Sequence, residues 1–410
     1  MIYIGILGFG VVGSGVTEVI SMNAEKIDMH LGQPLLVKKI LDIRKFPESE
    51  FADLLTSDVD AFFDDDDISI VVETVGGVGI AYEFTKRALS QGKTVVTSNK
   101  ELVATHGVEL MSIANQNNCA YLFEAAVGGA IPIIRPLHRC LAANRIMKIT
   151  GIVNGTTNYI LTQMMLSKTD FKTALASAQE KGYAEKNPSA DIDGIDAQRK
   201  ISILASIAMN GAYVDPNKIH TEGISAIDAT DIAYAKVLNS KIKLLAIFSN
   251  ANDTLAEMIV APHLVDEEVP LCVADGVFNA IMVKGNALGD AMFYGRGAGK
   301  FATASAVVGD VLDGALHKGK NAHITQWFYP EKEILFPFEE MKVKALLRFK
   351  NTTEDKKVRE YFPGTDVEQI DSIVENESAY IVGKNGTLSE KDLEEAIKNI
   401  PGFITRIRIY

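Results

Sequence analysis

The sequence has few cysteines and a deficit of positive charge. Its three cysteines, Cys119, Cys140 and Cys272, are odd in number and widely spaced. This pattern excludes a disulfide framework and a Cys-x-x-Cys metal site, and it is typical of a protein of the reducing cytoplasm. Lysine and arginine total 41 against 53 aspartates and glutamates, a formal net charge of −12. Such an acidic chain is a poor general binder of nucleic acid or of anionic membranes, so we expect neither partner.

Long hydrophobic runs are also missing. No apolar stretch approaches the ~18 residues that a membrane span requires. The first apolar stretch, Met1 to Val12, contains three glycines and has no basic residue ahead of it, so it predicts a buried strand entering a turn and not a signal peptide. Hydrophobic residues at 47% and charged residues at 23% are near the globular average and exclude wholesale disorder. A length of 410 residues, at ~150 per domain, predicts two or three domains.

Strands and helices alternate in the first third of the chain. Short β-branched runs predict strands at residues 2–7, 35–43, 68–73, 94–97 and 120–124, with helices at 11–27 and 81–91. This order is typical of a Rossmann-type, doubly wound parallel sheet, which we assign to a dinucleotide-binding domain over residues 1–134.

Two further domains are expected. Residues 135–320 predict an α+β domain, to which the resemblance named below assigns substrate binding, catalysis and dimerisation. The apolar-faced helix at 302–317 is expected to pack back on the first domain. A polar linker at 318–335 leads to a βαββαβ pattern over 336–410, the ferredoxin-like order. Its second helix is expected to begin at a capping box formed by Thr387 and Glu390.

The N-terminal turn carries a nucleotide-binding pattern. Gly8, Gly10 and Gly13 match G-x-G-x-x-G between a strand and a helix, where glycines let the backbone approach a pyrophosphate at the helix N-terminus. A glycine-rich turn that binds nothing is the alternative. The second strand ends in Asp42, Arg44 and Lys45; an acid would favour NAD and a base NADP, and the two adjacent cations favour NADP.

Residues 182–200 form the most informative stretch, because four carboxylates and a lysine are punctuated by glycine and proline. Asp196 and Lys200 lie at i and i+4, hence on one helix face. An exposed ion pair and a site for an amino acid, with the lysine as its acid–base group, are equally consistent with this pattern. The same balance holds for the polar turn at 152–158 and for Lys100, which follows a strand of the first domain.

These motifs together resemble homoserine dehydrogenases. The resemblance rests on Ala178-x-x-x-Gly182, Asn187-Pro188 and Asp191-Ile-x-Gly194-x-Asp196-x-x-x-Lys200, and it extends over about residues 1–320. Matching landmarks, in the family's order, are Thr97 to Lys100, Glu124 to Pro132, Asn154 to Leu161 and Gly295 to Gly299.

The resemblance implies reversible reduction of L-aspartate 4-semialdehyde to L-homoserine with NADP, or with NAD. It implies that Lys200, Lys100 and Asp196 are catalytic, Lys200 as proton donor, and that the substrate contacts are Glu185, Asp191, Asp196, Lys100 and Lys200. The implied cofactor contacts are Gly8, Phe9, Gly10, Val11, Val12, Gly13, Arg44, Lys45, Thr97 and Lys100.

The resemblance also implies a monovalent cation, sodium in most of the family, held by Glu124, Val127, Gly129 and Ile131. A homodimer or homotetramer is expected. The C-terminal unit resembles an ACT domain, but its first turn, 350–357, lacks the Asp-x-x-Gly pattern of an effector site, which argues against amino-acid regulation.

Two other functions fit these residues less well. An aspartate-semialdehyde dehydrogenase would need a cysteine nucleophile with a histidine base, and no cysteine lies in a recognisable nucleophile turn. A nucleotide-sensing protein built on an inactive enzyme would not need to keep both Lys100 and Lys200.

Overall fold

The structure is a computed structural model that describes residues 1–250, 255–317, 326–350 and 355–410. Its residues group into two compact units. The first unit contains residues 1–145, 202–216 and 295–331, and the second contains 146–201, 217–294 and 332–410. The predicted linker at 318–335 lies partly outside the described residues.

The first unit is built on a six-stranded sheet in which every neighbouring pair is parallel. Its strands are β1 (Ile2–Leu7), β2 (Leu35–Leu41), β3 (Leu55–Thr56), β4 (Ile68–Glu73), β5 (Thr94–Thr97) and β6 (Tyr121–Leu122). Their order, β3-β2-β1-β4-β5-β6, is that of a dinucleotide-binding sheet, which confirms the predicted fold class. In such a sheet the strand order reverses between β1 and β4, and ligands bind at that point, beyond the carboxyl ends of the strands.

Seven helices of the described chain belong to this unit: α1 (Val11–Met22), α2 (Ala24–Leu31), α3 (Val59–Phe63), α4 (Gly79–Ser90), α5 (Lys100–Gln116), α6 (Ile134–His138) and α12 (Lys300–Leu316). Helix α12 packs against α1, and its Val307 and Val311 share a hydrophobic core with Val16. The single helix predicted at 11–27 is wrong. It is interrupted at Asn23, whose Nδ2 donates to the carbonyl of Val19 and so competes with the helical backbone bonds.

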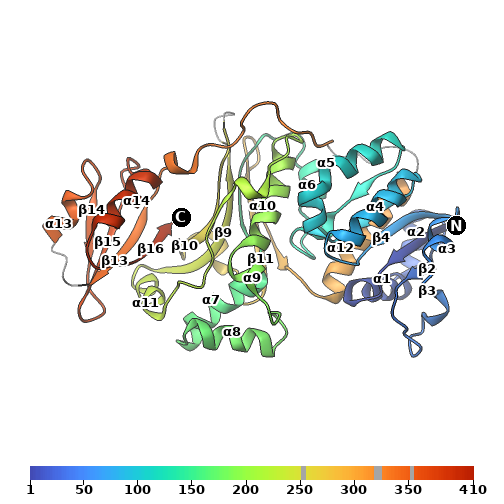
Figure 1. Cartoon of the computed structure of the whole chain (residues 1–410), viewed down its shortest axis with the longest axis horizontal. Coiled ribbons are helices and arrows are strands. Elements are labelled where there is room, and N and C mark those ends of the chain that lie inside the picture. Colours follow the sequence, from blue (N-terminus) through green and yellow to red (C-terminus); the bar gives the residue numbers. More distant parts are fainter. Residues whose placement is uncertain (251–254, 318–325, 351–354) are drawn as a thin grey trace. The chain divides into compact units, whose positions relative to one another are not determined.

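The second unit contains a mixed sheet of ten strands (Figure 1). Its first part comprises β7 (Ile146–Ile152), β8 (His220–Thr221), β9 (Ser240–Ser249), β10 (Glu257–Asp266), β11 (Phe278–Gly285) and β12 (Gly289–Arg296). The helices are α7 (Gly155–Ser167), α8 (Phe171–Glu180), α9 (Ser189–Ile192), α11 (Ala229–Val237) and the first half of α10 (Ile195–Ala208). Short 3₁₀ turns lie at Ala52–Leu54, Glu124–Ala126, Pro216–Lys218, Pro270–Val273 and Phe338–Glu340.

The C-terminal segment has the predicted βαββαβ order. It runs β13 (Ala345–Lys350), α13 (Asp355–Glu360), β14 (Val367–Ile370), β15 (Glu377–Val382), α14 (Glu390–Asn399) and β16 (Phe403–Ile409). The strand order β16-β13-β15-β14, antiparallel throughout, is the ferredoxin-like arrangement. Strand β16 also pairs in parallel with β10, so the C-terminal segment continues the central sheet. Part of the turn at 350–357 lies outside the described residues.

The predicted capping box of α14 is wrong. The N-cap is Ser389, whose hydroxyl accepts from the backbone N–H of Asp392 and donates to its carboxylate. Thr387 is used in the preceding turn, where its hydroxyl donates to Asn385 Oδ1 at 2.8 Å. The helix therefore starts two residues later than the sequence pattern indicates.

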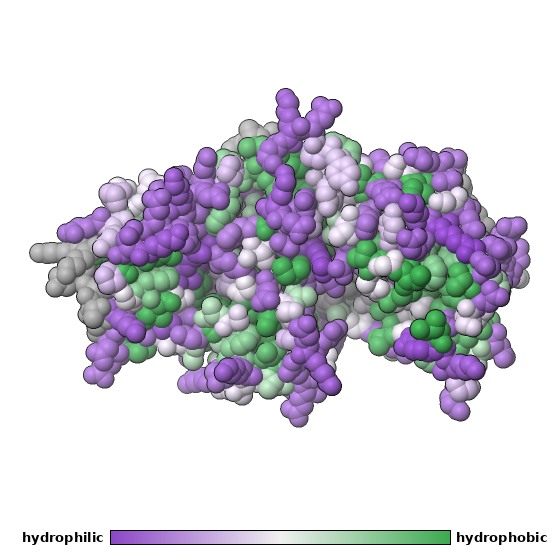
Figure 2. All heavy atoms as spheres, viewed as in Figure 1, coloured by the Kyte–Doolittle hydropathy of each residue, from purple (hydrophilic) through white to green (hydrophobic). Residues whose placement is uncertain are grey.

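Charged and apolar side chains share the surface. Figure 2 shows hydrophilic side chains over much of the visible face, with smaller hydrophobic patches between them. Within the described parts of the chain, no helix is both long and apolar enough to cross a membrane.

Candidate active site

The glycine-rich turn between β1 and α1 has the geometry of a phosphate cradle. Gly8 has a φ of +90°, which favours glycine, and a Cβ there would lie 3.1 Å from the carbonyl oxygen of Thr74. A Cβ on Gly13 would lie 2.0 Å from the oxygen of Gly8, so no side chain fits. Gly10 precedes α1 and has no side chain that could cap it. The N-terminal N–H groups of α1 can therefore bind a pyrophosphate.

The neighbouring residues serve the turn in different ways. Phe9 is buried and packs edge-on against Phe46, with ring centroids 5.1 Å apart, whereas its backbone N–H donates to Asp42 Oδ2 at 2.7 Å. Val11 is exposed at the first position of α1, and Val12 is partly buried against the core. Asp42, at the end of β2, thus fixes the turn through Phe9.

Asp42 is also paired with a cation. Arg44 Nε and Nη2 donate to its two carboxylate oxygens at 3.0 and 2.8 Å. The hydrogen bond from Arg44, with support from the N–H of Phe9 against the effect of burial, lowers the pKa of Asp42 to about 2. Arg44 is more than half exposed beside Gly10, and Lys45 follows it in the exposed loop. Asp42, the acid that would favour NAD, therefore orients Arg44, the base that would favour NADP.

Thr97 and Lys100 lie at the end of β5. The Thr97 hydroxyl donates to Glu73 Oε2 at 2.6 Å, and it accepts from the N–H of Asn99 at 2.9 Å. Asn99 caps α5, and Lys100 is the first residue of that helix. Glu73 is fully buried at the carboxyl end of β4, and its Oε1 accepts from the N–H of Val75 at 2.7 Å. The sequence motif did not single out Glu73, because its role depends on a partner 24 residues away.

In the second unit, Asp191, Asp196 and Lys200 lie together. Lys200 Nζ donates to Asp196 Oδ2 at 2.7 Å and to the carbonyl oxygen of Val153 at 2.7 Å. Asn154 Nδ2 donates to Asp196 Oδ2 at 2.8 Å and to Asp191 Oδ1 at 2.7 Å. Lys200 and Asp196 are only 8% and 4% exposed, so the pair is no ordinary surface ion pair.

Two local features place this cluster. Asn154 is the N-cap of α7, with its Oδ1 accepting from the N–H of Thr157, and the opposite end of the same amide binds both aspartates. Gly194, with a φ of +83°, lets the chain turn from α9 into α10. Glu185 lies exposed on the segment before α9, where its main-chain carbonyl accepts from Gln179 Nε2. The side chain of Glu185 is thus exposed, whereas Asp196 and Lys200 are buried.

The predicted cation loop is built around a buried carboxylate. Both oxygens of Glu124 accept backbone N–H bonds from residues 133–135, at 2.6 to 2.9 Å. Gly129 has a φ of +55° and packs so closely on Gly297 that a Cβ would lie 2.3 Å from that residue's oxygen. Val127 and Ile131 flank the glycines and are buried. The donor chemistry of a carboxylate and main-chain carbonyls suits a monovalent cation, although the Glu124 carboxylate also orders the start of α6.

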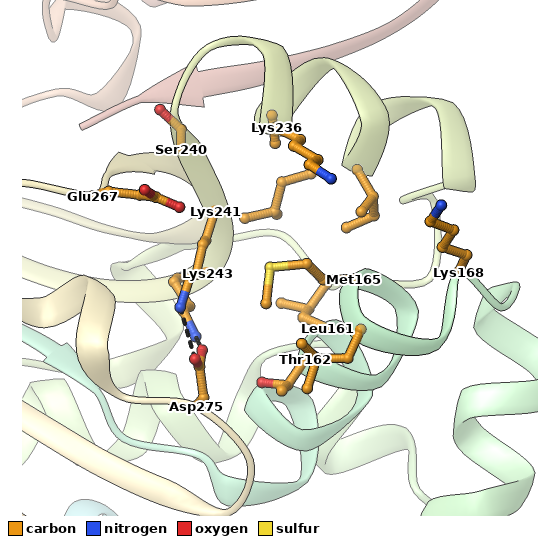
Figure 3. Close-up of a pocket in the computed structure, with 14 residues that line it drawn as sticks. Leu161, Thr162, Met165, Lys168, Lys236, Ser240, Lys241, Lys243, Glu267 and Asp275 are labelled. Atoms are coloured by element: carbon orange, nitrogen blue, oxygen red, sulfur yellow. Dashed lines mark hydrogen bonds and ion pairs between the residues drawn. The ribbon is translucent and has the colours of Figure 1, made fainter.

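A cavity lies elsewhere in the second unit. It has a volume of about 400 Å³ and is lined by α7, α11 and the start of β9 (Figure 3). Its floor includes Lys243, which is 1% exposed and donates to Asn158 Oδ1, Ala274 O and Asp275 Oδ1 at 2.6 to 2.9 Å. The cavity uses the C-terminal half of α7, whereas the Lys200 cluster uses the N-cap of that helix. The cavity and the Lys200 cluster are therefore lined by different residues.

Known proteins match both units. The protein-family model described as homoserine dehydrogenase matches residues 132–312. The family model described as homoserine dehydrogenase, NAD binding domain, matches residues 8–124. A Synechocystis homoserine dehydrogenase is 45% identical over 320 residues, which is 76% of this chain and 72% of that one. The chain belongs to the homoserine dehydrogenase family. It is thus an NAD(P)-dependent oxidoreductase that reversibly reduces L-aspartate 4-semialdehyde to L-homoserine, in threonine, methionine and isoleucine biosynthesis.

Solved homoserine dehydrogenases share the fold. The crystal structure of the Thiobacillus denitrificans enzyme has a TM-score of 0.90 at 34% identity, covering 100% of this chain and 98% of that one. A hyperthermophilic archaeal homoserine dehydrogenase in complex with NADPH has a TM-score of 0.65 at 30% identity, covering 77% of this chain and 98% of that one. A nicotinamide cofactor is thus the one this homoserine dehydrogenase uses.

Proposed function

We propose that Lys200 is the acid–base group of the dehydrogenase reaction. The observation that carries this assignment is the buried ammonium, fixed by Asp196 and by the carbonyl of Val153. The bound nicotinamide cofactor supplies a hydride to the aldehyde carbon. As charge develops on the aldehyde oxygen, the Lys200 ammonium stabilises it and delivers a proton, and the same amine takes the hydroxyl proton in the reverse direction.

Carboxylates of the second unit are proposed to hold the amino group of the substrate. Asp191 and Asp196 share the amide of Asn154, which keeps two anions side by side for a substrate ammonium. Glu185, exposed on the preceding segment, is proposed to close on the same ammonium. Lys100, at the start of α5, is proposed as the second amine of the site, beside the nicotinamide and the substrate.

NADP is proposed as the preferred form of the cofactor. Gly8 to Gly13 would hold the pyrophosphate, and Thr97 lies at the strand edge where a nicotinamide binds in this fold. Arg44, oriented by Asp42 and exposed beside Gly10, suits a ribose 2′-phosphate, with Lys45 adding charge. Because Asp42 is engaged by Arg44 and Phe9, it is poorly placed to accept from a ribose 2′-hydroxyl.

Two further properties belong to this proposal. A sodium ion would be held by oxygens of Glu124, Val127, Gly129 and Ile131, and would stiffen the loop before α6. A homodimer or homotetramer is proposed for the assembly, acting in the cytoplasm. A cysteine-based mechanism is disfavoured, since burial raises the pKa of Cys119 to about 11 and also raises that of Cys272.

The decisive experiment replaces Lys200. Lys200→Ala should lower kcat for homoserine oxidation by about 10²–10⁴-fold, the usual contribution of one acid–base group, while the Kd of NADPH stays unchanged. Lys218→Ala is the control, because Lys218 lies on the surface and pairs with Glu333 at 2.8 Å, with both side chains more than half exposed. Wild-type turnover in the Lys200 variant would remove this residue from the mechanism.

A further inference from the structure

Strand β16 reaches the substrate site through one partly buried glutamate, Glu222. Arg408, on β16, donates from Nη1 and Nη2 to the two carboxylate oxygens of Glu222 at 2.8 and 2.9 Å. Arg406 lies two residues earlier, hence on the same face of the strand, and its Nη2 donates to Glu222 Oε1 at 2.6 Å. Two arginines of the C-terminal segment thus hold one carboxylate.

Further contacts hold Arg408 and Glu222 in place. Arg408 is 4% exposed and donates on its other side to Glu390 Oε1, from Nε, at 2.6 Å. His220 Nε2 lies 2.8 Å from Glu222 Oε1, and its ring stacks on Phe338 with centroids 3.5 Å apart. Burial alone would raise the pKa of Glu222, but the hydrogen bonds from His220 and Arg408 outweigh it and hold the pKa below its usual range. The carboxylate therefore stays ionised.

The backbone next to Glu222 supports the turn that carries the substrate carboxylates. The N–H of Ile224 donates to the carbonyl of Ile192 at 2.8 Å. A Cβ on Gly223 would lie 2.3 Å from that same oxygen, and a Cβ on Gly194 would lie 3.2 Å from the carbonyl oxygen of Glu222. The segment 222–224 and the turn 192–194 are thus in direct backbone contact.

A second link reaches α10 itself. Gln198 Nε2 donates to the carbonyl of Ile219 at 3.2 Å and to Thr221 Oγ1 at 2.9 Å. Gln198 lies between Asp196 and Lys200 on this helix and is 8% exposed. Any shift of the segment 219–224 would therefore move both the turn after Asp191 and the helix that carries Lys200.

We propose that Glu222, gripped by Arg406 and Arg408, is a positioning residue for the Asp191, Asp196 and Lys200 cluster. The C-terminal segment then contributes to turnover by bracing the substrate site through its final strand. This inference rests on the proposed roles of the cluster. Glu222 itself is argued to touch neither substrate nor cofactor.

The test compares two partly buried, arginine-bound acids in the 410-residue chain. Glu222→Gln keeps size and removes the charge; Glu377→Gln is the matched control, because Glu377 accepts from Arg348 Nε and Nη2 at 3.0 and 2.9 Å in the same unit. Displacements of ~1 Å cost up to about 10²-fold, so we expect Glu222→Gln to lower kcat/KM for homoserine roughly 10- to 100-fold. The Kd of NADPH should stay unchanged in both variants, and kcat/KM should stay near wild type in Glu377→Gln.

If Glu222→Gln does not fold, Gln198→Met replaces it in the test. This variant removes only the hydrogen bonds from Gln198 to Ile219 and Thr221, so it should lower kcat/KM for homoserine by a smaller factor. Equal kcat/KM for Glu222→Gln and Glu377→Gln, or a wild-type value in Gln198→Met where that variant stands in, would overturn the proposal. Failure of the underlying assignment looks different, since Lys200→Ala would then keep its turnover whatever the result at Glu222.

Discussion

Asn154 offers a quantitative test of the substrate site, because the oxygen and the nitrogen of its side-chain amide form different hydrogen bonds. Its Oδ1 caps α7 by accepting from the N–H of Thr157 at 2.8 Å. Its Nδ2 donates to both Asp191 and Asp196, and the side chain is 5% exposed. Replacement of an N-cap by alanine costs ~1 kcal/mol. A hydrogen bond to a charged group contributes ~1.5–3 kcal/mol.

Three substitutions separate these contributions. Asn154→Ser keeps a capping oxygen and loses both donated bonds, so we expect the free energy of unfolding to fall by about 3 kcal/mol, the low end of the range for two such bonds. Asn154→Ala also loses the cap and should be ~1 kcal/mol less stable again. Asn154→Asp keeps the cap but adds a third carboxylate beside two others, which should raise the pKa of at least one of them.

The assays are urea unfolding and the steady-state kinetics of homoserine oxidation. Because a raised carboxyl pKa favours the protonated folded state, the Asn154→Asp variant should gain stability relative to wild type as the pH falls through that pKa. All three variants should lower kcat/KM for homoserine and leave the Kd of NADPH unchanged. The reasoning is refuted if the Ser and Ala variants unfold alike and both keep the wild-type kcat/KM.

Three further outcomes are expected in the nucleotide-binding unit. Arg44→Ala should weaken NADPH use by about tenfold, the scale of one lost charge-assisted contact, and should spare NADH use, as measured by the ratio of kcat/KM values. Gly13→Ala should abolish NADPH binding in a fluorescence titration, because its Cβ would lie 2.0 Å from the oxygen of Gly8. Asp42 has a pKa of about 2 in the folded chain, lowered mainly by Arg44, so its stabilising effect is complete above the unfolded pKa of ~4 and is lost as the pH falls towards 2. Acid titration of Asp42→Asn should lack this loss.

Features that depend on neighbouring residues were predictable from the sequence. The G-x-G-x-x-G spacing predicted a tight turn between a strand and a helix, because Gly8 needs a positive φ and Gly13 leaves no room for a side chain beside Gly8. Asp196 and Lys200 were expected on one helix face, and the i, i+4 ion pair is present at 2.7 Å. The βαββαβ order of the C-terminal segment followed from alternating short elements.

Features that depend on distant partners were not predictable. Glu73 reads as the end of a buried strand, and only its bond to Thr97, 24 residues away, relates it to the cofactor edge. Glu222 reads as a surface acid until Arg406 and Arg408, more than 180 residues later, fold against it. The start of α14 was also not predictable. The hydroxyl of Thr387 lies within hydrogen-bond distance of Asn385 Oδ1 and of Gly364 O, 23 residues earlier, and Ser389 caps the helix instead.

Helices that follow a strand begin in two different ways in this chain. Asn99 and Asn154 each follow a strand and cap the next helix with a side-chain oxygen, so the helix N–H groups of α5 and α7 have an internal acceptor. The amide nitrogen of each then remains to donate elsewhere, to Gly77 O in one case and to two aspartates in the other. Gly10 occupies the equivalent place before α1 and offers no side-chain acceptor, so there the N–H groups remain open to an anion from outside the chain. The residue at this backbone position thus decides whether a helix start is capped from within the chain or left open for a ligand such as the proposed pyrophosphate.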